Sequence, residues 1–325
     1  MYKEKKYLLS LFIMLFLAIS ENSASAVTQS SRVSHSRTAS VRPSPTNSNG
    51  AKPTLSPAQQ SAVNVAKETY ASTIKQAREG AKRAVAEGAK VMIHGLELDW
   101  ANEVLSEVGK ENASIYIEDF ANEGACERLV DYTIKTYGKI DSIVNNAAKV
   151  VSSNLASTDI DFLERVFLVN TFSPFLMIKY ALPHLTASKG AVLNIGSVNA
   201  YSGEPNLLAY SMSKGALMTM TRNLGDTLHR ENGVRVNQIN PGWVLTETEK
   251  KRKHDHGLPE DWYKDLPKVY APAGRILWPE EIAAASIYWL SDESGPISGQ
   301  VVDLEQHPFI GRNPPKDNST IPTKK

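Results

Sequence analysis

Cysteine is almost absent from this sequence of 325 residues, which contains only Cys126. A single thiol cannot form an internal disulfide, and it excludes the Cys-rich and mixed Cys/His zinc sites that require several ligands. Net charge is also nearly absent, because 36 Lys and Arg residues oppose 35 Asp and Glu residues to give +1. This balance provides no basic surface for nucleic acid or for an anionic membrane. We therefore expect no nucleic-acid partner and no metal site.

An apolar run long enough for a stable membrane span is missing from the N-terminus. Residues 7–20 are apolar but number 14, whereas a spanning helix needs about 20. They follow the basic start MYKEKK and precede ENSASA, which ends in small residues at Ala24 and Ala26. This order is typical of a secretory signal peptide cleaved after Ala26, so residues 1–26 predict export to the periplasm or the medium. An uncleaved anchor and a misassigned start codon are alternatives, and without a genuine signal the protein would be cytoplasmic.

Large apolar residues are sparse in the next segment. Residues 27–57 are rich in Ser, Thr, Pro and Asn, and we expect them to form a disordered linker, as we do for the tail at 313–325. The 42% hydrophobic content is sufficient for one sizeable domain, which we place at residues 58–312. Its first element is predicted from apolar spacing as a helix over 57–87.

The rest of this domain alternates apolar strand patterns with amphipathic helix patterns. Such alternation predicts an α/β fold in which helices cover both faces of a doubly wound parallel sheet. The six predicted strands cover residues 89–95, 113–120, 139–148, 190–197, 234–242 and 299–305.

Tyr210 and Lys214 lie four residues apart on a predicted helix, so both side chains project from one face. An ammonium beside a phenol lowers the pKa of the tyrosine, which would make Tyr210 a usable acid or base near neutral pH. Taken alone, such a pair is usually an ordinary surface feature of a helix.

Other polar features point to the same edge of the sheet. Ser197 ends the strand VLNIGS, the segments NNAA (145–148) and NPGWVLTET (240–248) end two further strands, and Asn170 interrupts the apolar helix VFLVNTF. Ligands of open α/β sheets bind beyond the carboxyl ends of the strands. We therefore expect these residues to converge on one site.

This ordered set resembles the short-chain dehydrogenase/reductase family, over about residues 80–305. The resemblance implies a Rossmann-like three-layer α/β/α fold and NAD(P)-dependent hydride transfer between a small secondary alcohol and a ketone. It implies that Tyr210 is the catalytic acid/base and that Ser197 orients the substrate oxygen. Lys214 would hold the nicotinamide ribose and depress the pKa of the tyrosine, and Asn170 would position a water in the proton relay. A homodimer or homotetramer built on helices 159–187 and 209–231 is also implied.

The resemblance carries over further cofactor contacts. It assigns Asp119 to the adenine ring, Asn146 to the adenine ribose, and Val244 and Thr246 to the nicotinamide amide, in addition to Tyr210 and Lys214. The choice between NAD and NADP stays open, because Gly95 and Leu96 place neither an acid nor an arginine where the ribose would be read.

The loop at 247–275 would cover the substrate. It combines many charges with Trp262, Tyr263 and Tyr270, which suits a sugar or polyol better than a steroid or a long acyl chain.

The sequence lacks a glycine-rich turn and the apolar strand that would precede it. Family members open with both, and backbone amides of that turn approach the pyrophosphate. Here only Gly80 could match the last glycine, and the preceding residues favour a helix. The central first strand is therefore predicted to be missing or replaced by helix, with SAVNVAK (61–67) as the one poor substitute. Two alternatives to an active enzyme follow, an exported non-catalytic relative and a damaged gene product.

Overall fold

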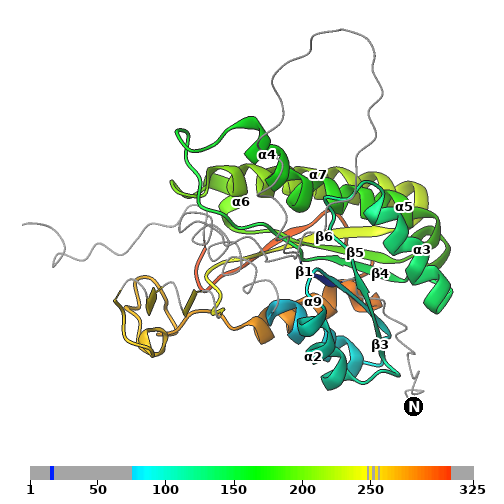
Figure 1. Ribbon diagram of the computed structural model, residues 1–325, viewed down its shortest axis with the longest axis horizontal. Helices are drawn as coiled ribbons and strands as arrows, with labels where there is room; N and C mark the ends of the chain where they lie inside the picture. Colours follow the sequence, from blue (N-terminus) through cyan, green and yellow to red (C-terminus); the bar gives the residue numbers. More distant parts are fainter. Residues whose placement is uncertain (1–14, 18–74, 247–248, 251–252, 255–256, 309–325) are drawn as a thin grey trace, which may run out of the picture.

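The structure of the chain is a computed structural model, and it describes residues 15–17, 75–246, 249–250, 253–254 and 257–308 (Figure 1). The predicted linker and tail lie outside these residues, as do SAVNVAK and most of the predicted signal peptide.

All the strands run parallel, in two neighbouring sets. The first set has the order β1-β2-β3 and the second the order β4-β5-β6-β7. Each of the six predicted strands is present, which confirms the predicted α/β fold. The strands are β1 (Leu15–Leu17), β2 (Val91–Gly95), β3 (Ala113–Ile117), β4 (Ser142–Asn145), β5 (Ala191–Ile195), β6 (Arg235–Pro241) and β7 (Val301–Leu304).

The slot for the missing first strand is occupied by β1, which lies within the predicted signal peptide. Leu15, Phe16 and Leu17 pair with Ile93, His94 and Gly95 of β2. β1 also lies beside β4, but no ladder of hydrogen bonds joins the two strands in the described part of the chain. The strand order is thus that of a doubly wound sheet, with a seam where the short strand meets β4.

Helices cover both faces of the sheet (Figure 1). One face carries the helix at 75–86, α2 (Leu98–Val108) and α9 (Pro279–Leu290), which share one apolar core with the strands. The opposite face carries α3 (Ala125–Tyr137), α5 (Ser173–Ser188) and α7 (Leu208–Asn232), which pack around a second core that includes Cys126.

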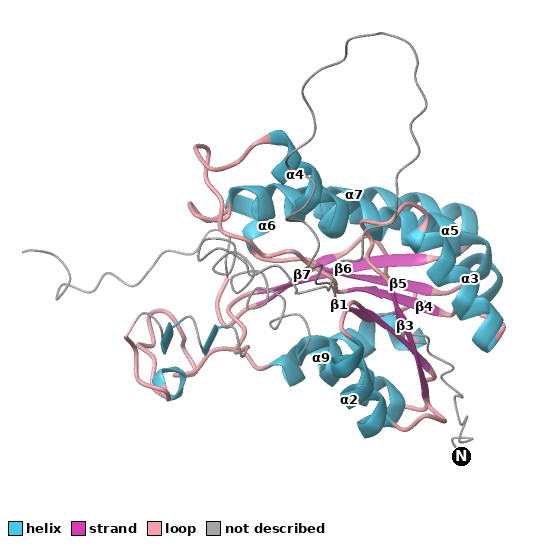
Figure 2. Cartoon of the chain, viewed as in Figure 1, coloured by secondary structure: helices cyan, strands magenta, loops and turns pink. Residues whose placement is uncertain are grey.

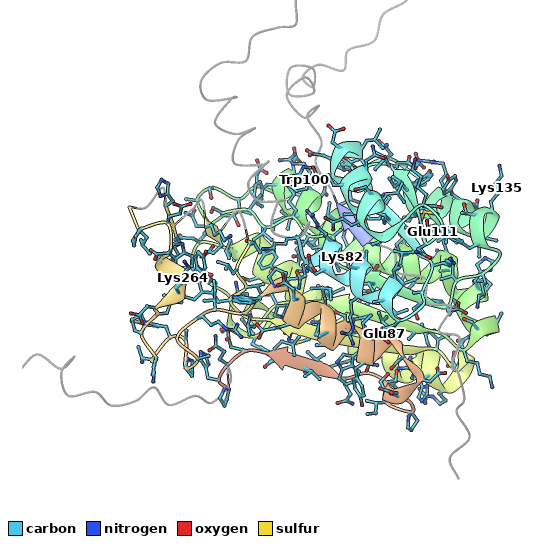
Figure 3. All side chains as sticks on the ribbon, turned by 90° about the horizontal axis from the view of Figure 1, so that it is seen from below. Lys82, Glu87, Trp100, Glu111, Lys135 and Lys264 are labelled. Atoms are coloured by element: carbon cyan, nitrogen blue, oxygen red, sulfur yellow. The ribbon has the colours of Figure 1, made fainter. Side chains whose placement is uncertain are left out.

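The helix at 75–86 is continuous through Gly80. Its buried positions, Ala77, Ala81 and Ala84, recur at helical spacing. Lys82, within the helix, and Glu87, just after its end, are exposed (Figure 3). The predicted helix over 57–87 is therefore confirmed for its second half, and its first half lies outside the described residues.

Residues 160–188 form one long helical run composed of α4 (Ile160–Phe167), a π-helical turn η1 (Leu168–Phe172) and α5. By length and composition this run could cross a membrane, but half of its most apolar window is buried inside the protein. Its contacts with α3 and α7 are those of a core helix.

The buried His94 of β2 provides a measurable pH signature. Burial lowers its pKa to about 3, from an ordinary value of 6.5, and its ring stacks on that of Phe120 with centroids 4.4 Å apart. The unfolded chain therefore takes up a proton between pH 6.5 and 3 that the folded chain excludes. The free energy of unfolding should fall by about 1.4 kcal/mol per pH unit through this window from His94 alone, and should be unaffected above it.

We expect His94→Leu to flatten this acid limb in denaturant titrations at pH 7.5, 6 and 5. The exposed His254 supplies the matched control, because His254→Gln should retain the wild-type slope. An unchanged slope in His94→Leu would contradict the assignment.

Candidate active site

The carboxyl ends of three neighbouring strands bring the predicted residues together. Asn146 follows β4, Ser197 follows β5, and Asn240 lies near the end of β6. All three are buried, which is unusual for polar side chains and indicates that each has a defined partner or a ligand to meet. Since the strands are parallel and adjacent, their ends form one edge of the sheet.

Tyr210 and Lys214 face this edge from the first turns of α7. Both are buried, with exposed fractions of 8% and 2%, and the Lys214 ammonium nitrogen lies 5.7 Å from the centroid of the Tyr210 ring. Lys214 Nζ donates a hydrogen bond to the carbonyl oxygen of Ile195, at 2.6 Å. The side chain of Ser197 lies near the Tyr210 hydroxyl, close enough to favour its ionised form. The predicted catalytic serine and tyrosine therefore lie close together, with the lysine beside them.

The pKa of Tyr210 corrects the sequence prediction. We expected Lys214 to lower it, but burial raises it to about 12, and the nearby Ser197 side chain opposes this increase only in part. Burial also lowers the pKa of Lys214 to about 7, so only part of the population carries the positive charge at neutral pH. Its ammonium group donates to the Ile195 carbonyl rather than to the phenol. In the protein without a bound cofactor, desolvation thus outweighs the attraction between the two groups.

Asn170 is fully buried in the π-helical turn η1, a type of helix irregularity that is frequent at functional sites. Its amide oxygen accepts the backbone N–H of Lys149 at 2.6 Å, and its Nδ2 donates to the Lys149 carbonyl at 3.1 Å. Nδ2 also lies 2.9 Å from Ser213 Oγ, which in turn donates to the Tyr210 carbonyl at 2.7 Å. Asn170 therefore joins the segment after NNAA to the helix that carries Tyr210.

Sequence reasoning did not identify Ser213 or Lys149. Ser213 is the residue just before Lys214, and its hydroxyl couples η1 to α7. Burial lowers the pKa of Lys149, which follows NNAA directly, and the neighbouring Arg165 lowers it further. Only the proximity of Ser213 to Lys214 in the chain could have indicated it, because a serine within a helix carries no distinctive pattern.

The predicted cofactor contacts follow the carboxyl ends of β3, β4 and β6. Asp119 follows β3, and its carboxylate accepts the backbone N–H of Ala121 at 2.8 Å, so this aspartate stabilises the turn after the strand. Val244 forms a β-bridge with Leu277, and Thr246 is buried with its hydroxyl accepting the N–H of Glu249 at 3.2 Å. Both lie where the chain leaves β6 for the loop over the site.

A small pocket opens between the helix at 75–86, α9 and the ends of β4 and β5. It is lined by Gln76, Gly80, Asn146, Ile195, Ser286 and their neighbours. The Nε2 atom of Gln76 is buried there without a hydrogen-bond partner, so the pocket contains a donor available to a ligand. Gln76 and Asn146, which line the same pocket, are polar side chains that could meet part of a dinucleotide. The described residues contain no glycine-rich turn of the kind that binds pyrophosphate in the family. Gln76 lies four residues before Gly80, in the stretch where that turn was expected.

The loop between β6 and α9 extends away from the sheet (Figure 2). Aromatic side chains of this loop, with Leu245 and Ile276, form a small apolar cluster of their own. The rings of Trp243 and Trp262 stack with centroids 5.5 Å apart, and Lys253 lies over both rings. Trp243 Nε1 donates to Glu249 at 2.9 Å. Residues 247–248, 251–252 and 255–256 of the predicted lid lie outside the described residues, and Tyr270 is 67% exposed.

This arrangement defines a class of protein: an α/β domain with a serine, a tyrosine and a lysine at the carboxyl edge of a parallel sheet. The sequence profile described as Enoyl-(Acyl carrier protein) reductase matches residues 76–305. The chain belongs to this family of short-chain dehydrogenases/reductases, and members of the family generally use NAD or NADP.

Several relatives have a similar sequence or structure. An uncharacterized oxidoreductase of Bacillus subtilis is 35% identical over 216 residues, which cover 65% of this chain and 71% of the relative. The glucose and ribitol dehydrogenase of Daucus carota is 33% identical over 220 residues, covering 65% and 72%. A double mutant of a Serratia marcescens short-chain dehydrogenase/reductase superposes with a TM-score of 0.62 at 28% identity, covering 71% of this chain and 91% of that structure.

Proposed function

We propose that this oxidoreductase interconverts a secondary alcohol and a ketone by NAD(P)-dependent hydride transfer, with Tyr210 as the acid/base. The observation that carries the proposal is the burial of Ser197 beside Tyr210, with Lys214 in the adjacent turn of α7. Three polar groups buried together at a sheet edge are costly to fold, which favours a functional reason for their presence.

In the proposed reaction the cofactor transfers the hydride and the protein transfers the proton. The nicotinamide, when bound, supplies or accepts the hydride. In the reduction direction, Tyr210 donates its phenolic proton to the substrate oxygen as negative charge develops on it. Its raised pKa keeps the phenol protonated at neutral pH, so it is ready to act as an acid. Ser197 lies near Tyr210 and can donate a hydrogen bond to the same oxygen, which orients the carbonyl.

Lys214 and Asn170 would support these two residues. Lys214 would hold the nicotinamide ribose through its ammonium group, and a pKa of about 7 allows its charge to respond to what binds beside it. Asn170 fixes the backbone at Lys149 and would position the water of the proton relay from there. Asp119, Asn146, Val244 and Thr246 would complete the cofactor contacts. The proposal covers both NAD and NADP. The residue that distinguishes the two cofactors would lie at the end of β2, and there the chain has the uncharged Gly95 and Leu96.

We propose a sugar or polyol as the substrate. The relatives include a glucose and ribitol dehydrogenase and, at 30% identity over 211 residues, a meso-2,3-butanediol dehydrogenase of Serratia marcescens. The loop with Trp243, Trp262 and Lys253 supplies both apolar surface and charge, as a hydroxyl-rich ligand would require. A homodimer or homotetramer is also proposed, because Phe172, Phe175 and Met212 are 44–47% exposed on η1, α5 and α7.

The test is a fluorescence titration of the purified chain with NADH and NADPH, followed by assays with ribitol, glucose and meso-2,3-butanediol. We expect saturable binding of at least one cofactor and turnover of at least one of these alcohols. A folded protein that binds neither cofactor would contradict the proposal and favour the non-catalytic alternative. Binding without turnover of any tested alcohol would contradict the proposed substrate class.

A further inference from the structure

The turn that presents Ser197 is attached to the end of β6 by a side chain as well as by backbone. The backbone N–H of Gly196 donates to the carbonyl of Ile239 at 2.8 Å, which continues the sheet beyond β5. The backbone N–H of Ser197 donates to the side-chain oxygen of Asn240, at 3.2 Å. Asn240 is fully buried, so water does not compete for this contact. The position of the catalytic serine therefore depends on where the Asn240 amide lies.

The Asn240 amide is itself held in one orientation. Its oxygen also accepts from Gln238 Nε2 at 2.7 Å, and its Nδ2 donates to the carboxylate of Asp303 at 3.1 Å. An amide flip would place the NH₂ group against two donors and the oxygen against a carboxylate, so it is excluded. The same Asp303 oxygen accepts from the hydroxyl of Tyr201, at 3.0 Å. Tyr201 lies in α6 (Asn199–Ser202), directly after Ser197, and both sides of this turn thus depend on Asp303.

The network continues from Gln238 into the helix of the other catalytic residues. Gln238 Oε1 lies 2.9 Å from Thr221 Oγ1 on α7, and Thr221 Oγ1 accepts from Asn194 Nδ2 at 2.8 Å. All of these side chains are fully buried. The network therefore connects the strand end that carries Ser197 to the helix that carries Tyr210, and such connected buried networks are rigid.

Space around the turn leads to the same conclusion. A Cβ atom on Gly196 would collide with the side chains of both Asn240 and Gln238. The two amides therefore fill the volume next to the turn, and a change in either one would move the backbone that carries Ser197. We propose that Asn240, held by Asp303, is a positioning residue that sets the Ser197 hydroxyl against Tyr210 and the substrate oxygen. This inference rests on the proposed function, because it assigns Ser197 its role there.

Asn240→Asp tests the inference with almost no change of shape. The variant keeps an acceptor for Ser197 but places two carboxylates together at Asp303, so the pair should move apart. Misplacement of a catalytic group by about 1 Å can reduce turnover about 100-fold, and we expect kcat to fall roughly 10- to 100-fold. The KM for meso-2,3-butanediol or ribitol and the Kd for cofactor should change less than about twofold, because Asn240 is not assigned a contact with either ligand.

Two further variants separate positioning from general damage. The double variant Asn240→Asp/Asp303→Asn exchanges donor and acceptor between positions 240 and 303 and restores the hydrogen bond between them, while the Tyr201 hydroxyl changes from donor to acceptor. The kcat should therefore return to within a fewfold of wild type. In a Ser197→Ala background, Asn240→Asp should reduce kcat no further, because the group that it positions is absent. Recovery of the melting temperature without recovery of kcat would overturn the inference, as would full additivity with Ser197→Ala.

The outcome for the wild type separates the inference from the proposed function. If the wild-type chain turns over neither alcohol, the proposed function fails and the inference fails with it. If the wild type is active and Asn240→Asp retains its kcat, only the inference is overturned.

Discussion

Removal of residues 1–26 should strongly destabilise the folded domain. These residues include β1, the strand that pairs with β2 at the centre of the fold. Its loss leaves the inner edges of β2 and β4 without the chain between them, and each unpaired buried backbone group costs about 1–3 kcal/mol. Several such groups amount to a large part of the roughly 5–15 kcal/mol that stabilises a typical domain. We therefore expect the truncated chain to bind cofactor poorly and to melt at a much lower temperature.

The measurement compares denaturant unfolding of the full chain and of the chain beginning at Val27. Phe16→Pro in the full chain makes the same test at a single position, because proline in a sheet removes a ladder hydrogen bond. The buried acceptor that is left unpaired should cost about 1–3 kcal/mol. Ser40→Pro, in the predicted linker, is the matched control and should have no effect. Equal stability of the full and truncated chains would show that β1 is dispensable, and it would favour a signal peptide that is removed on export.

This experiment also addresses the two interpretations of the N-terminus. A signal peptidase cleaving after Ala26 would remove β1 from the mature protein. A molecule that has lost residues 1–26 on export therefore cannot contain β1 in its fold. N-terminal sequencing of the mature protein from its natural host would identify which occurs.

Tyr210→Phe should abolish turnover while leaving cofactor binding nearly intact. The substitution deletes the hydroxyl alone, so the ring remains packed beneath Lys214. Loss of a general acid or base typically costs 10²–10⁴-fold in rate. Because the phenol has a pKa of about 12, its buried neutral form contributes a proton rather than a charge, and its removal should not disturb the folded state.

Steady-state kinetics and NADH titration of the variant provide the measurement. Tyr132→Phe on α3 is the matched control, since that ring is 39% exposed and distant from the site in the sequence. Turnover of Tyr210→Phe within tenfold of wild type would refute the assigned role, even if the cofactor still binds.

Strands β2 and β5 were predictable because each is a largely apolar run that is fully buried in the sheet. The position of β1 was not, because its sequence matches a signal peptide and its pairing with β2 connects residues 78 positions apart. Local pattern does not encode such a contact. The family resemblance indicated a central first strand, but the sequence was expected to lack it, and β1 pairs with β2 in its place.

The convergence of the candidate site residues was predictable from the sequence, whereas their pKa shifts were not. Ser197, Tyr210 and Lys214 could be placed at one edge by strand order and helix spacing. The direction of the Tyr210 pKa shift was wrong, because the sequence shows the neighbouring charge and not the extent of burial. Ser213 was missed, and the contacts of Asn240 were not predicted, for a related reason. An amide or hydroxyl acquires its role only through partners brought from other elements.

The seam between β1 and β4 separates two groups of candidate functional residues. Asn170, Ser197, Tyr210 and Lys214 all belong to the side built on β4–β7, and the connections among them remain on that side. The other side contributes the helix at 75–86, with Gln76 in the pocket, and the strands beneath it. Under the proposed function, substitutions in the helix at 75–86 would weaken cofactor binding and leave the four proposed catalytic residues unchanged. A relative that binds but does not turn over its ligand could therefore arise without a substitution at Asn170, Ser197, Tyr210 or Lys214.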